Sequence, residues 1–375
     1  MRITLDVSPA VNGKAGLGRY AASLAKAVAA QRPGQVHLFA NVAPGACWPD
    51  DLAMLPRTSV RAGYKPWRLA VLAGQIGHTD WSAMLPHPVL FHATEHLLIP
   101  LRSIPTVLTV HDLIYRLFPQ HHKKLNYGYL NLAMPIYVRR ADHVIAVSQA
   151  TRHDLIRLYG TPAEKVTVVY EAAAPLFAPQ PTEKIAEVRG KYRLPERYLI
   201  TVGTIEPRKN LARLVEALAV LRRTDPDVCL VVVGAKGWLY GGFFDAIQQH
   251  RQQEAVILPG YVPDDDLPAM IAGAAVSVTA SLYEGFGLPV LEAMACGAPV
   301  ACSRTSSVGE IAGDAALTFD PQCVEEMVEA IGRVLGDAGL CSSLRERGFR
   351  RAAEFSWERA ASETWAVYER VAAGW

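Results

Sequence analysis

Two series of short apolar runs divide the chain, and a polar or glycine-containing turn and then a helical pattern follow each run. The first series consists of Arg2–Ser8, Val36–Val42, Val89–Ala93, Thr106–Val110 and His143–Val147. The second consists of Tyr198–Gly203, Val228–Gly234, Val256–Leu258, Val276–Ala280, Pro299–Cys302 and Ala316–Phe319. Continuous apolar runs of this length are typical of parallel strands buried on both faces. The predicted fold class is therefore α/β, with two doubly wound, Rossmann-like domains.

The boundary between the domains is predicted from composition. A length of 375 residues suits two domains. The segment Glu171–Pro181 is rich in alanine and proline, the composition of a linker. We therefore expect domains at 1–178 and 179–356. The segment 357–375 has its apolar residues on one helical face, with Ser356 as N-cap, and is expected to pack back on the first domain.

Charge and composition exclude several classes of protein. The formal net charge is +2, so binding to nucleic acid through overall charge is not expected. No run approaches the length of a membrane span, and the first residues lead directly into a strand, which predicts a cytoplasmic globular protein. The six cysteines form no Cys-x-x-Cys pair, so neither zinc nor disulfides are expected.

The most informative motif follows the run Val276–Ala280, where ligands of open α/β sheets bind. It reads Glu-Gly-Phe-Gly-Leu-Pro-Val-Leu-Glu-Ala-Met-Ala-Cys-Gly-Ala-Pro-Val. Glu284 is predicted in the loop and Glu292 in the first turns of the following helix. Gly285 and Gly287 allow close approach of the backbone to a ligand. Two carboxylates of this kind suit a ligand with several hydroxyl groups.

This motif resembles the acidic signature of the family 4 retaining glycosyltransferases of the GT-B fold. The resemblance implies that Glu284 and the loop that follows hold the donor sugar, and that Glu292 binds the nucleotide ribose. The loop residues to which it assigns donor contacts are Gly285, Phe286, Gly287 and Leu288.

A basic turn follows the first strand of the second domain. Arg208 and Lys209 stand side by side after Tyr198–Gly203, before a helix predicted from about Leu211. A guanidinium and an ammonium in this place form a clamp for a diphosphate. The turn resembles the pyrophosphate site of the same family, in which the two cations stabilise the departing nucleoside diphosphate. No metal is then required.

The first domain offers two further loops. Gly16 and Gly18 lie in a glycine-rich stretch after the first strand, whose spacing matches neither a dinucleotide fingerprint nor a P-loop. It resembles the family's loop over the donor phosphates. His111 and Asp112 end the run Thr106–Val110; the family commonly has a His-Asp pair there, which implies a sugar or phosphate contact for His111 and an acceptor-side role for Asp112. Ser148 is a weaker candidate.

Two loops of the second domain complete the predicted donor site. Lys236 follows Val228–Gly234 and is a candidate phosphate or base contact, while an exposed loop charge is nearly as good an interpretation. Tyr261 and Val262 are candidates for packing on the nucleobase, edge packing being the alternative. The run Asp264–Asp266 contains an Asp-x-Asp pattern able to hold Mg²⁺ or Mn²⁺. Its place before an apolar helical segment favours capping of that helix.

The resemblance implies a retaining transferase that moves a hexose, mannose from GDP-mannose being the best guess, to a glycan or lipid-diphosphate acceptor in surface polysaccharide synthesis. The basic, aromatic stretch Arg116–Arg140 fits either an anionic membrane surface or a solvated helix face. Alternatives are a nucleotide-sugar epimerase, which converts the donor without an acceptor, and a sugar-phosphate synthase with a soluble acceptor. A catalytically silent sugar-nucleotide-binding scaffold is a further alternative, disfavoured by the joint presence of Glu284, Glu292, Arg208 and Lys209.

Overall fold

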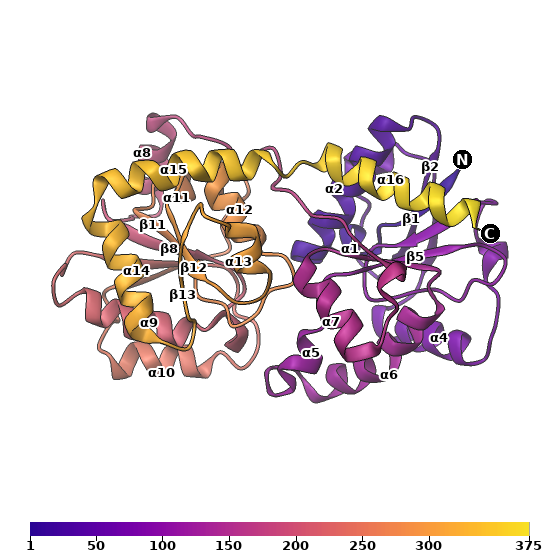
Figure 1. The fold of residues 1–375 in the computed structure, drawn as a ribbon, viewed down its shortest axis with the longest axis horizontal. Coiled ribbons are helices and arrows are strands. Elements are labelled where there is room, and N and C mark those ends of the chain that lie inside the picture. The colour runs from indigo at the N-terminus through magenta and orange to yellow at the C-terminus, as the bar shows by residue number, and fades with distance from the viewer. Residues whose placement is uncertain (375) are drawn as a thin grey trace. The chain divides into compact units, whose positions relative to one another are not determined.

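The computed structural model describes residues 1–374 and consists of two compact units (Figure 1). Unit 1 comprises Met1–Glu171 together with the carboxyl-terminal segment that begins at Ser356, and unit 2 comprises Ala172–Phe355. The chain therefore passes between the units at Glu171–Ala172, earlier than the position 178 expected from the linker composition. The alanines of that segment already belong to unit 2.

Unit 1 contains one sheet of seven parallel strands in the order β3-β2-β1-β4-β5-β6-β7. The strands are β1 (Ile3–Asp6), β2 (Val36–Val42), β3 (Arg57–Arg61), β4 (Leu90–Ala93), β5 (Thr106–Val110), β6 (His143–Ala146) and β7 (Val166–Val168). The strands β3 and β7 were not predicted, because both lie at sheet edges. There β3 alternates exposed and half-buried residues and β7 is very short, so neither forms a continuous apolar run.

Helices cover both faces of this sheet (Figure 1). They are α1 (Ser8–Val11), α2 (Ala15–Gln31), α3 (Asp50–Ala53), α4 (Tyr64–Ile76), α5 (Ile114–Leu117), α6 (Lys124–Arg140), α7 (Gln149–Tyr159) and α16 (Trp357–Ala373), with single 3₁₀ turns at Ser82–Met84, Pro119–His121 and Ala163–Lys165. The Ser356 hydroxyl accepts a hydrogen bond from the Arg359 backbone N–H at 3.1 Å, so the predicted N-cap of α16 is confirmed. The helix packs on α2, with the Tyr20 and Trp357 rings 5.9 Å apart.

Unit 2 contains a second parallel sheet, in the order β10-β9-β8-β11-β12-β13. Its strands are β8 (Tyr198–Val202), β9 (Cys229–Val233), β10 (Val256–Gly260), β11 (Val276–Thr279), β12 (Val300–Ser303) and β13 (Leu317–Phe319). Its helices are α8 (Thr182–Lys191), α9 (Leu211–Leu221), α10 (Gly241–Gln249), α11 (Leu267–Ala272), α12 (Leu288–Ala295), α13 (Ser306–Ala312), α14 (Val324–Gly336) and α15 (Ala338–Ala353), with a 3₁₀ turn, η4, at Pro207–Lys209.

The central strands are buried on both faces, which confirms the reading of the apolar runs. Both sheets have the strand order of the doubly wound fold, with a central strand from which the order runs outward in both directions, so the predicted fold class is confirmed. In unit 1 the order reverses between β1 and β4, and in unit 2 between β8 and β11. The loops that follow these two pairs of strands are where this fold places its ligands.

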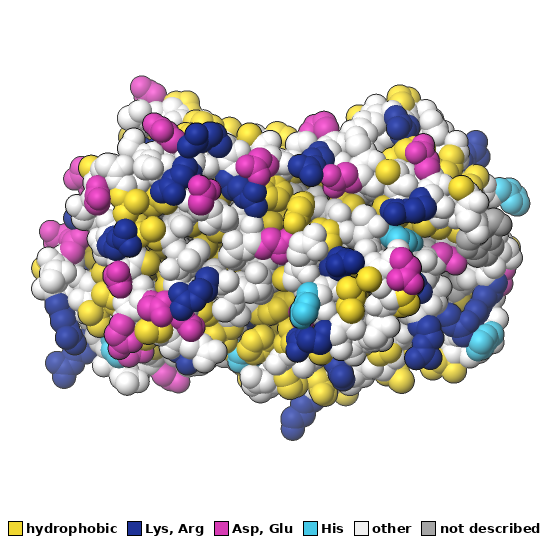
Figure 2. Space-filling model, viewed as in Figure 1, with side chains coloured by type: hydrophobic (Ala, Val, Ile, Leu, Met, Phe, Trp, Pro, Cys, Tyr) yellow, Lys and Arg dark blue, Asp and Glu magenta, His cyan; other side chains and the backbone are white. Residues whose placement is uncertain are grey.

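The surface carries mixed charges. Figure 2 shows acidic and basic side chains interspersed over much of the visible face, as a net charge of +2 suggests. No helix within the described residues is long and apolar enough to cross a membrane. All six cysteines are free thiols.

Candidate functional site

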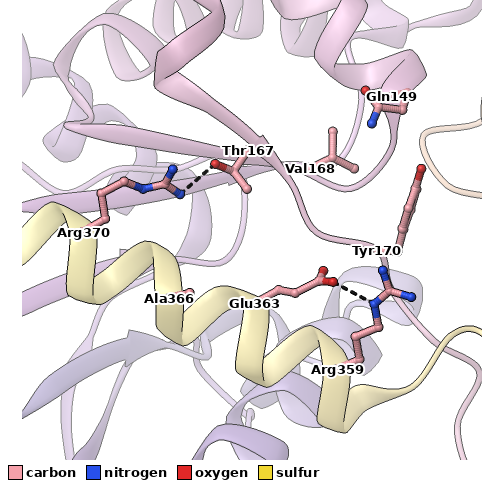
Figure 3. Close-up of a pocket in the computed structure, with 8 residues that line it drawn as sticks. All are labelled: Gln149, Thr167, Val168, Tyr170, Arg359, Glu363, Ala366 and Arg370. Atoms are coloured by element: carbon pink, nitrogen blue, oxygen red, sulfur yellow. Dashed lines mark hydrogen bonds and ion pairs between the residues drawn. The ribbon is translucent and has the colours of Figure 1, made fainter.

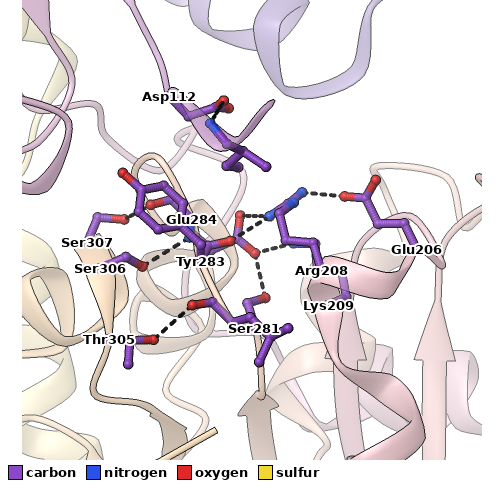
Figure 4. Close-up of polar contacts among 12 residues, drawn as sticks. Asp112, Glu206, Arg208, Lys209, Ser281, Tyr283, Glu284, Thr305, Ser306 and Ser307 are labelled. Atoms are coloured by element: carbon purple, nitrogen blue, oxygen red, sulfur yellow. Dashed lines mark hydrogen bonds and ion pairs between the residues drawn. The ribbon is translucent and has the colours of Figure 1, made fainter. Parts of the chain in front are cut away.

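In unit 2 the loops after β8 and β11 bring together three of the predicted residues (Figure 4). Arg208 and Lys209 lie in η4, and Glu284 lies in the loop before α12. The Lys209 ammonium donates to one carboxylate oxygen of Glu284 at 2.7 Å, and the Arg208 guanidinium donates to the other. A second guanidinium nitrogen of Arg208 donates to the Glu206 carboxylate. Glu206 was not predicted from the sequence, although it lies two residues before Arg208.

Glu284 is held as a carboxylate. Its residue is 8% exposed, and burial by itself would raise its pKa, but the charges of Arg208 and Lys209 outweigh burial and bring the pKa to about 2. The Ser281 hydroxyl also donates to it at 2.6 Å. The negative charge of Glu284 and the positive charges of the basic turn therefore compensate each other in the free protein.

The backbone of the Glu284 loop is fixed by the start of α13. The Glu284 N–H donates to the Ser306 hydroxyl at 3.0 Å, and the Ser307 hydroxyl donates to the Glu284 carbonyl at 2.8 Å (Figure 4). Thr305 donates to the Leu282 carbonyl at 3.1 Å. These hydroxyl side chains were missed by the sequence analysis. The available signal was their position directly after β12, the neighbour of β11 in the sheet.

A glycine after β8 makes room for the basic turn. Gly203 has φ of 144°, and a Cβ there would lie 2.9 Å from the Lys209 Cε. Gly234, after β9, is in closer contact still, because its Cβ would lie 2.2 Å from the Gly203 carbonyl oxygen. These two glycines let the loops after β8 and β9 approach each other and let the Lys209 side chain lie over the backbone.

The remaining residues of the acidic motif surround the start of α12. Gly287 has φ of 110° and immediately precedes α12, whose first residue is Leu288. Phe286 is buried, with its ring 6.1 Å from that of Phe355, and Gly285 is buried as well. Glu292 lies inside α12, as predicted, and is 2% exposed. The structure thus places this predicted set in one short segment, while the donor contacts assigned to it stay a prediction.

The residues predicted to border the nucleotide lie on the loops after β9 and β10. A parallel bridge joins Ile205 to Lys236, which brings the β9 loop beside the loop that leads to η4. Lys236 is exposed, with its ammonium 4.9 Å from the Phe244 ring centroid. Tyr261 is exposed, whereas Val262 is buried. The Tyr261 side chain is therefore accessible to a ligand, and the Val262 side chain contributes to packing.

The last residue of the aspartate run does not cap α11 with its side chain. Asp266 directly precedes α11, but its side chain makes no capping hydrogen bond. Its carboxylate instead accepts from the Lys191 ammonium at 2.6 Å and the Tyr192 hydroxyl at 2.9 Å. The capping hypothesis is therefore wrong for the Asp266 side chain, because the Lys191 ammonium of α8 and the Tyr192 hydroxyl that follows α8 engage its carboxylate. No group of three potential metal ligands occurs within residues 1–374.

In unit 1, His111 follows β5 and has both ring nitrogens engaged. Nε2 donates to the Thr94 carbonyl at 2.9 Å, and Nδ1 lies 3.1 Å from the Glu171 carboxylate. Both partners are acceptors, so the charged imidazolium satisfies them best. Burial lowers the pKa of His111, but the hydrogen bond and the charge of Glu171 raise it above its usual value. Contact of a ligand with the His111 ring nitrogens would have to displace one of these partners.

Asp112 and Ser148 support backbone. The Asp112 carboxylate accepts from the Ile114 N–H at 3.0 Å, at the start of α5. The Ser148 hydroxyl accepts from the Thr151 N–H at 3.0 Å and caps α7. The Thr151 hydroxyl in turn donates to the His111 carbonyl at 3.0 Å. Ser148 therefore acts through the local structure that holds His111.

A second group of ionisable residues lies after β1 and β4, at the point where the strand order of unit 1 reverses, and was missed by the sequence analysis. Lys14 and Glu95 form an ion pair of 2.5 Å. Asp6 is fully buried, and burial raises its pKa to about 7 although Ser8 donates to it. His96 accepts from the His111 backbone N–H at 3.2 Å, and burial lowers its pKa to about 4. Asp6 and Lys14 are more than 80 residues before Glu95 and His96 and form no motif with them. They come together because β1 and β4 are neighbours in the sheet.

Gly16 and Gly18 lie in the first turn of α2 rather than in the loop before it, which corrects the predicted position. A Cβ on Gly18 would lie 2.9 Å from the Pro9 carbonyl oxygen, so this glycine lets α2 pack against α1. A Cβ on Gly16 would meet nothing within 4 Å, and the residue is exposed. Of the two glycines, only Gly16 is therefore accessible to a ligand.

A separate hollow of unit 1, of about 280 Å³, lies between α16 and β7 (Figure 3). The Arg370 guanidinium donates to the Thr167 hydroxyl at 3.1 Å, and Arg359 pairs with Glu363 at 2.7 Å along α16. None of the predicted catalytic or donor-binding residues lines it. Its contacts attach the carboxyl-terminal helix to the edge of the sheet.

Two doubly wound parallel sheets, with a basic turn and an acidic loop at adjacent strands of the second, define a protein of the GT-B class. Residues 184–351 match the family described as glycosyl transferases group 1, and residues 15–173 match Glycosyltransferase Family 4. The chain is 30% identical to the O-antigen chain mannosyltransferase B of Escherichia coli, over 98% of this chain and 100% of that protein. The chain belongs to glycosyltransferase family 4, and it is a glycosyltransferase.

Solved structures share the fold along the whole chain. Sucrose-phosphate synthase from Thermosynechococcus elongatus covers 100% of this chain and 100% of its own, with a TM-score of 0.78 at 21% identity. HepE from Anabaena, solved in complex with UDP and glucose, covers 98% of this chain and 99% of its own, with a TM-score of 0.72 at 18% identity. At these identities the likeness shows the fold alone.

Proposed function

We propose that this glycosyltransferase moves a hexose from a nucleoside diphosphate sugar to a glycan or lipid-linked acceptor in cell-surface polysaccharide synthesis, with retention at the anomeric carbon. GDP-mannose is the proposed donor, and the match along both full chains to an O-antigen mannosyltransferase supports it. The observation that carries the proposal is the contact of Arg208 and Lys209 with Glu284 at the two central strands of unit 2.

Donor binding then rearranges these ion pairs. The diphosphate competes with Glu284 and Glu206 for the Arg208 guanidinium and with Glu284 for the Lys209 ammonium. When the diphosphate engages the two cations, the oxygens of Glu284 become available to accept hydrogen bonds from sugar hydroxyls. The cations stay beside the phosphate on which negative charge grows as the glycosidic bond to the donor breaks. This supply of positive charge supports our proposal that transfer needs no metal.

We propose that the leaving phosphate helps to take the acceptor proton, on the same face of the sugar as the attack. In the donor complex the Glu284 carboxylate, displaced from Arg208 and Lys209, is assigned to the sugar hydroxyls rather than to attack on the anomeric carbon. His111 is held by Glu171 and Thr94 and supplies a positive charge rather than a base. Trapping of a covalent glycosyl adduct on Glu284 would contradict this mechanism.

The donor assay uses the purified full chain with GDP-mannose, UDP-glucose and a lipid-diphosphate-linked oligosaccharide, and NMR defines the anomeric product. We expect transfer from GDP-mannose with retention, and the same rate in EDTA. Lys209→Gln should lower kcat by about a hundredfold, because one charge at the leaving group is lost. Lys236→Gln, an exposed lysine on the neighbouring loop, is the matched control and should change KM more than kcat.

Three results would contradict the proposal. Conversion of the donor in the absence of acceptor would indicate an epimerase. Transfer only to a soluble phosphosugar would indicate a sugar-phosphate synthase. Binding of the nucleotide without transfer to any acceptor tested would indicate a scaffold.

We also propose that the α4–α6 face of unit 1 contacts the anionic lipids on the inner side of the cytoplasmic membrane. Leu125 and Leu132, seven positions apart on α6, are 91% and 55% exposed, and Leu69 on α4 is 62% exposed. The two helices are joined by Arg68 of α4, whose guanidinium lies 3.7 Å from the Tyr129 ring. Figure 2 shows Lys and Arg beside hydrophobic side chains where α5 and α6 lie in Figure 1. Exposed leucines among cations are typical of a surface that inserts shallowly into a bilayer.

Cosedimentation with vesicles tests this surface. The double variant Leu125→Ser and Leu132→Ser should weaken binding to phosphatidylglycerol vesicles at least tenfold. Met54→Ser, which removes an equally exposed apolar side chain elsewhere in unit 1, should leave binding unchanged. Equal binding of both variants and the unaltered chain would contradict the membrane contact while leaving the transferase proposal intact.

A further inference from the structure

A groove lies between the carboxyl-terminal ends of α4 and α6 in unit 1. It is at the opposite end of the unit 1 strands from the candidate residues of that unit. Helix α6 ends at Arg140, just before β6 begins at His143, so the groove lies at the amino-terminal ends of the strands. The candidate residues of unit 1, such as His111 after β5, lie at their carboxyl-terminal ends. The groove has a volume of about 390 Å³. Its lining residues are Gln75, Ile76, His78, Ile136, Arg139 and Arg140.

Positive charges crowd together at this groove. The Arg140 guanidinium lies 2.9 Å from the His78 Nε2. Burial lowers the pKa of Arg140, and the positive charges of Arg102 and Arg139 lower it further. The Arg102 backbone N–H donates to Asp80 at 3.1 Å, two residues after His78, so Arg102 lies beside the groove. Like charges held together in this way favour an anion between them.

Arg102 provides an independent observation. Its Nε and one terminal nitrogen are buried and have no hydrogen-bond partner within residues 1–374. The Asp80 carboxylate, which accepts from the Arg102 backbone N–H at 3.1 Å, also accepts from Ser82 at 3.0 Å and from Ser103 at 2.5 Å. Buried guanidinium donors without acceptors are costly, so the structure leaves here a set of donors that an external acceptor would satisfy.

We propose that this groove binds a phosphate group. Planar guanidiniums pair with phosphate oxygens in a bidentate manner; Arg139 and Arg140 in the wall of the groove supply them, and Arg102 beside the groove adds further donors. Ile76, which is 56% exposed, and Ile136 line the same groove and offer contact to an apolar portion of the ligand. The phosphate can therefore belong to a lipid headgroup or be free in solution. The site is separate from the proposed donor site and does not depend on the identity of the sugar.

The test is a titration followed by NMR of isoleucine methyl groups in the full chain, first with inorganic phosphate and then with a short-chain phosphatidylglycerol below its micelle concentration. Ile76 and Ile136 report on the groove, and Ile205 reports on the basic turn of unit 2, where phosphate is also expected to bind. We expect saturable shifts of Ile76 and Ile136. The variants Arg140→Gln and Arg102→Gln should each raise the half-saturating concentration at least tenfold.

The matched control is Arg61→Gln, which removes an exposed arginine from β3 of the same unit and should leave the titration within twofold of the unaltered chain. Unchanged methyl positions of Ile3 and Ile145, which are buried in the core of unit 1, confirm before the titration that each variant is folded. Shifts with phosphatidylglycerol alone would identify the ligand as a lipid headgroup, and shifts with both ligands would show that a phosphate suffices. The proposal would be overturned if the Ile76 and Ile136 signals respond to neither ligand. It would also be overturned if Arg140→Gln and Arg102→Gln both leave the half-saturating concentration as it is in the unaltered chain.

Discussion

Lys209 and Glu284 form an ion pair of 2.7 Å that joins the loops after β8 and β11, the two central strands of the unit 2 sheet. The same carboxylate meets Arg208, which also pairs with Glu206, so two anions balance the two cations predicted to bind the diphosphate. The free protein thus keeps its basic turn ordered through an internal acid. To bind, a donor has to replace the Glu284 carboxylate with its phosphates as the partner of Arg208 and Lys209.

Replacement of Glu284 by Gln should lower the free energy of unfolding by about 3 kcal/mol, because it leaves two largely buried cations without their shared counter-charge. Urea unfolding of the full chain, followed by far-UV circular dichroism, measures the change. Glu187→Gln, which removes an exposed carboxylate paired with Lys184, is the control and should leave the stability nearly unchanged. Equal stability of Glu284→Gln and the unaltered chain would show that the ion pairs contribute nothing net.

The contribution of Glu284 should depend on pH in a defined direction. Its pKa is about 2 in the folded protein and 4.5 ordinarily, so its stabilisation is present above pH 4.5 and is lost as the pH falls from there toward 2. The difference between the two values corresponds to about 3 kcal/mol. The gap in stability between the unaltered chain and Glu284→Gln should therefore narrow between pH 6 and pH 3. A gap that stays constant would indicate that charge is not the cause.

Gly16 and Gly18 should respond to alanine in opposite ways. A Cβ at Gly18 would lie 2.9 Å from the Pro9 carbonyl oxygen, and relief of that contact should cost about 1–3 kcal/mol of stability. A Cβ at Gly16 meets nothing within 4 Å, so Gly16→Ala should stabilise α2 by up to about 1 kcal/mol. Thermal unfolding of both variants measures this difference. If Gly16→Ala is stable yet transfers sugar more slowly, the predicted donor contact of Gly16 gains direct support.

Glu171 should determine the charge of His111. Because Glu171 raises the folded pKa of His111, its stabilisation is complete below pH 6.5 and is lost as the pH rises through that folded value. Glu171→Gln should lower the pKa of His111, as measured by NMR titration of the imidazole Cε1–H. The stability difference between the variant and the unaltered chain should be larger at pH 6 than at pH 9. An unaltered His111 titration would show that Thr94 alone fixes the ring.

Local sequence predicted those parts of the protein that depend on neighbouring residues in the chain. Central strands such as Thr106–Val110 are buried on both faces, so they appear as uninterrupted apolar runs. Edge strands are half-exposed, so Arg57–Arg61 carries no such run and was missed. Ser356 was predicted correctly because an N-cap is a local arrangement. Asp266 was not, because its partners Lys191 and Tyr192 come from another helix.

The site divides in the same way. Glu284, Arg208 and Lys209 were found because each lies in a motif directly after a strand, and the sequence by itself determined their chemistry. Only the tertiary structure decided that the three side chains neutralise one another, since the contact depends on β8 and β11 being neighbours. It also assembled Lys14 with Glu95 and Arg102 with Arg140, which are distant in sequence. A strand order brings such residues together, and no spacing along the chain encodes it.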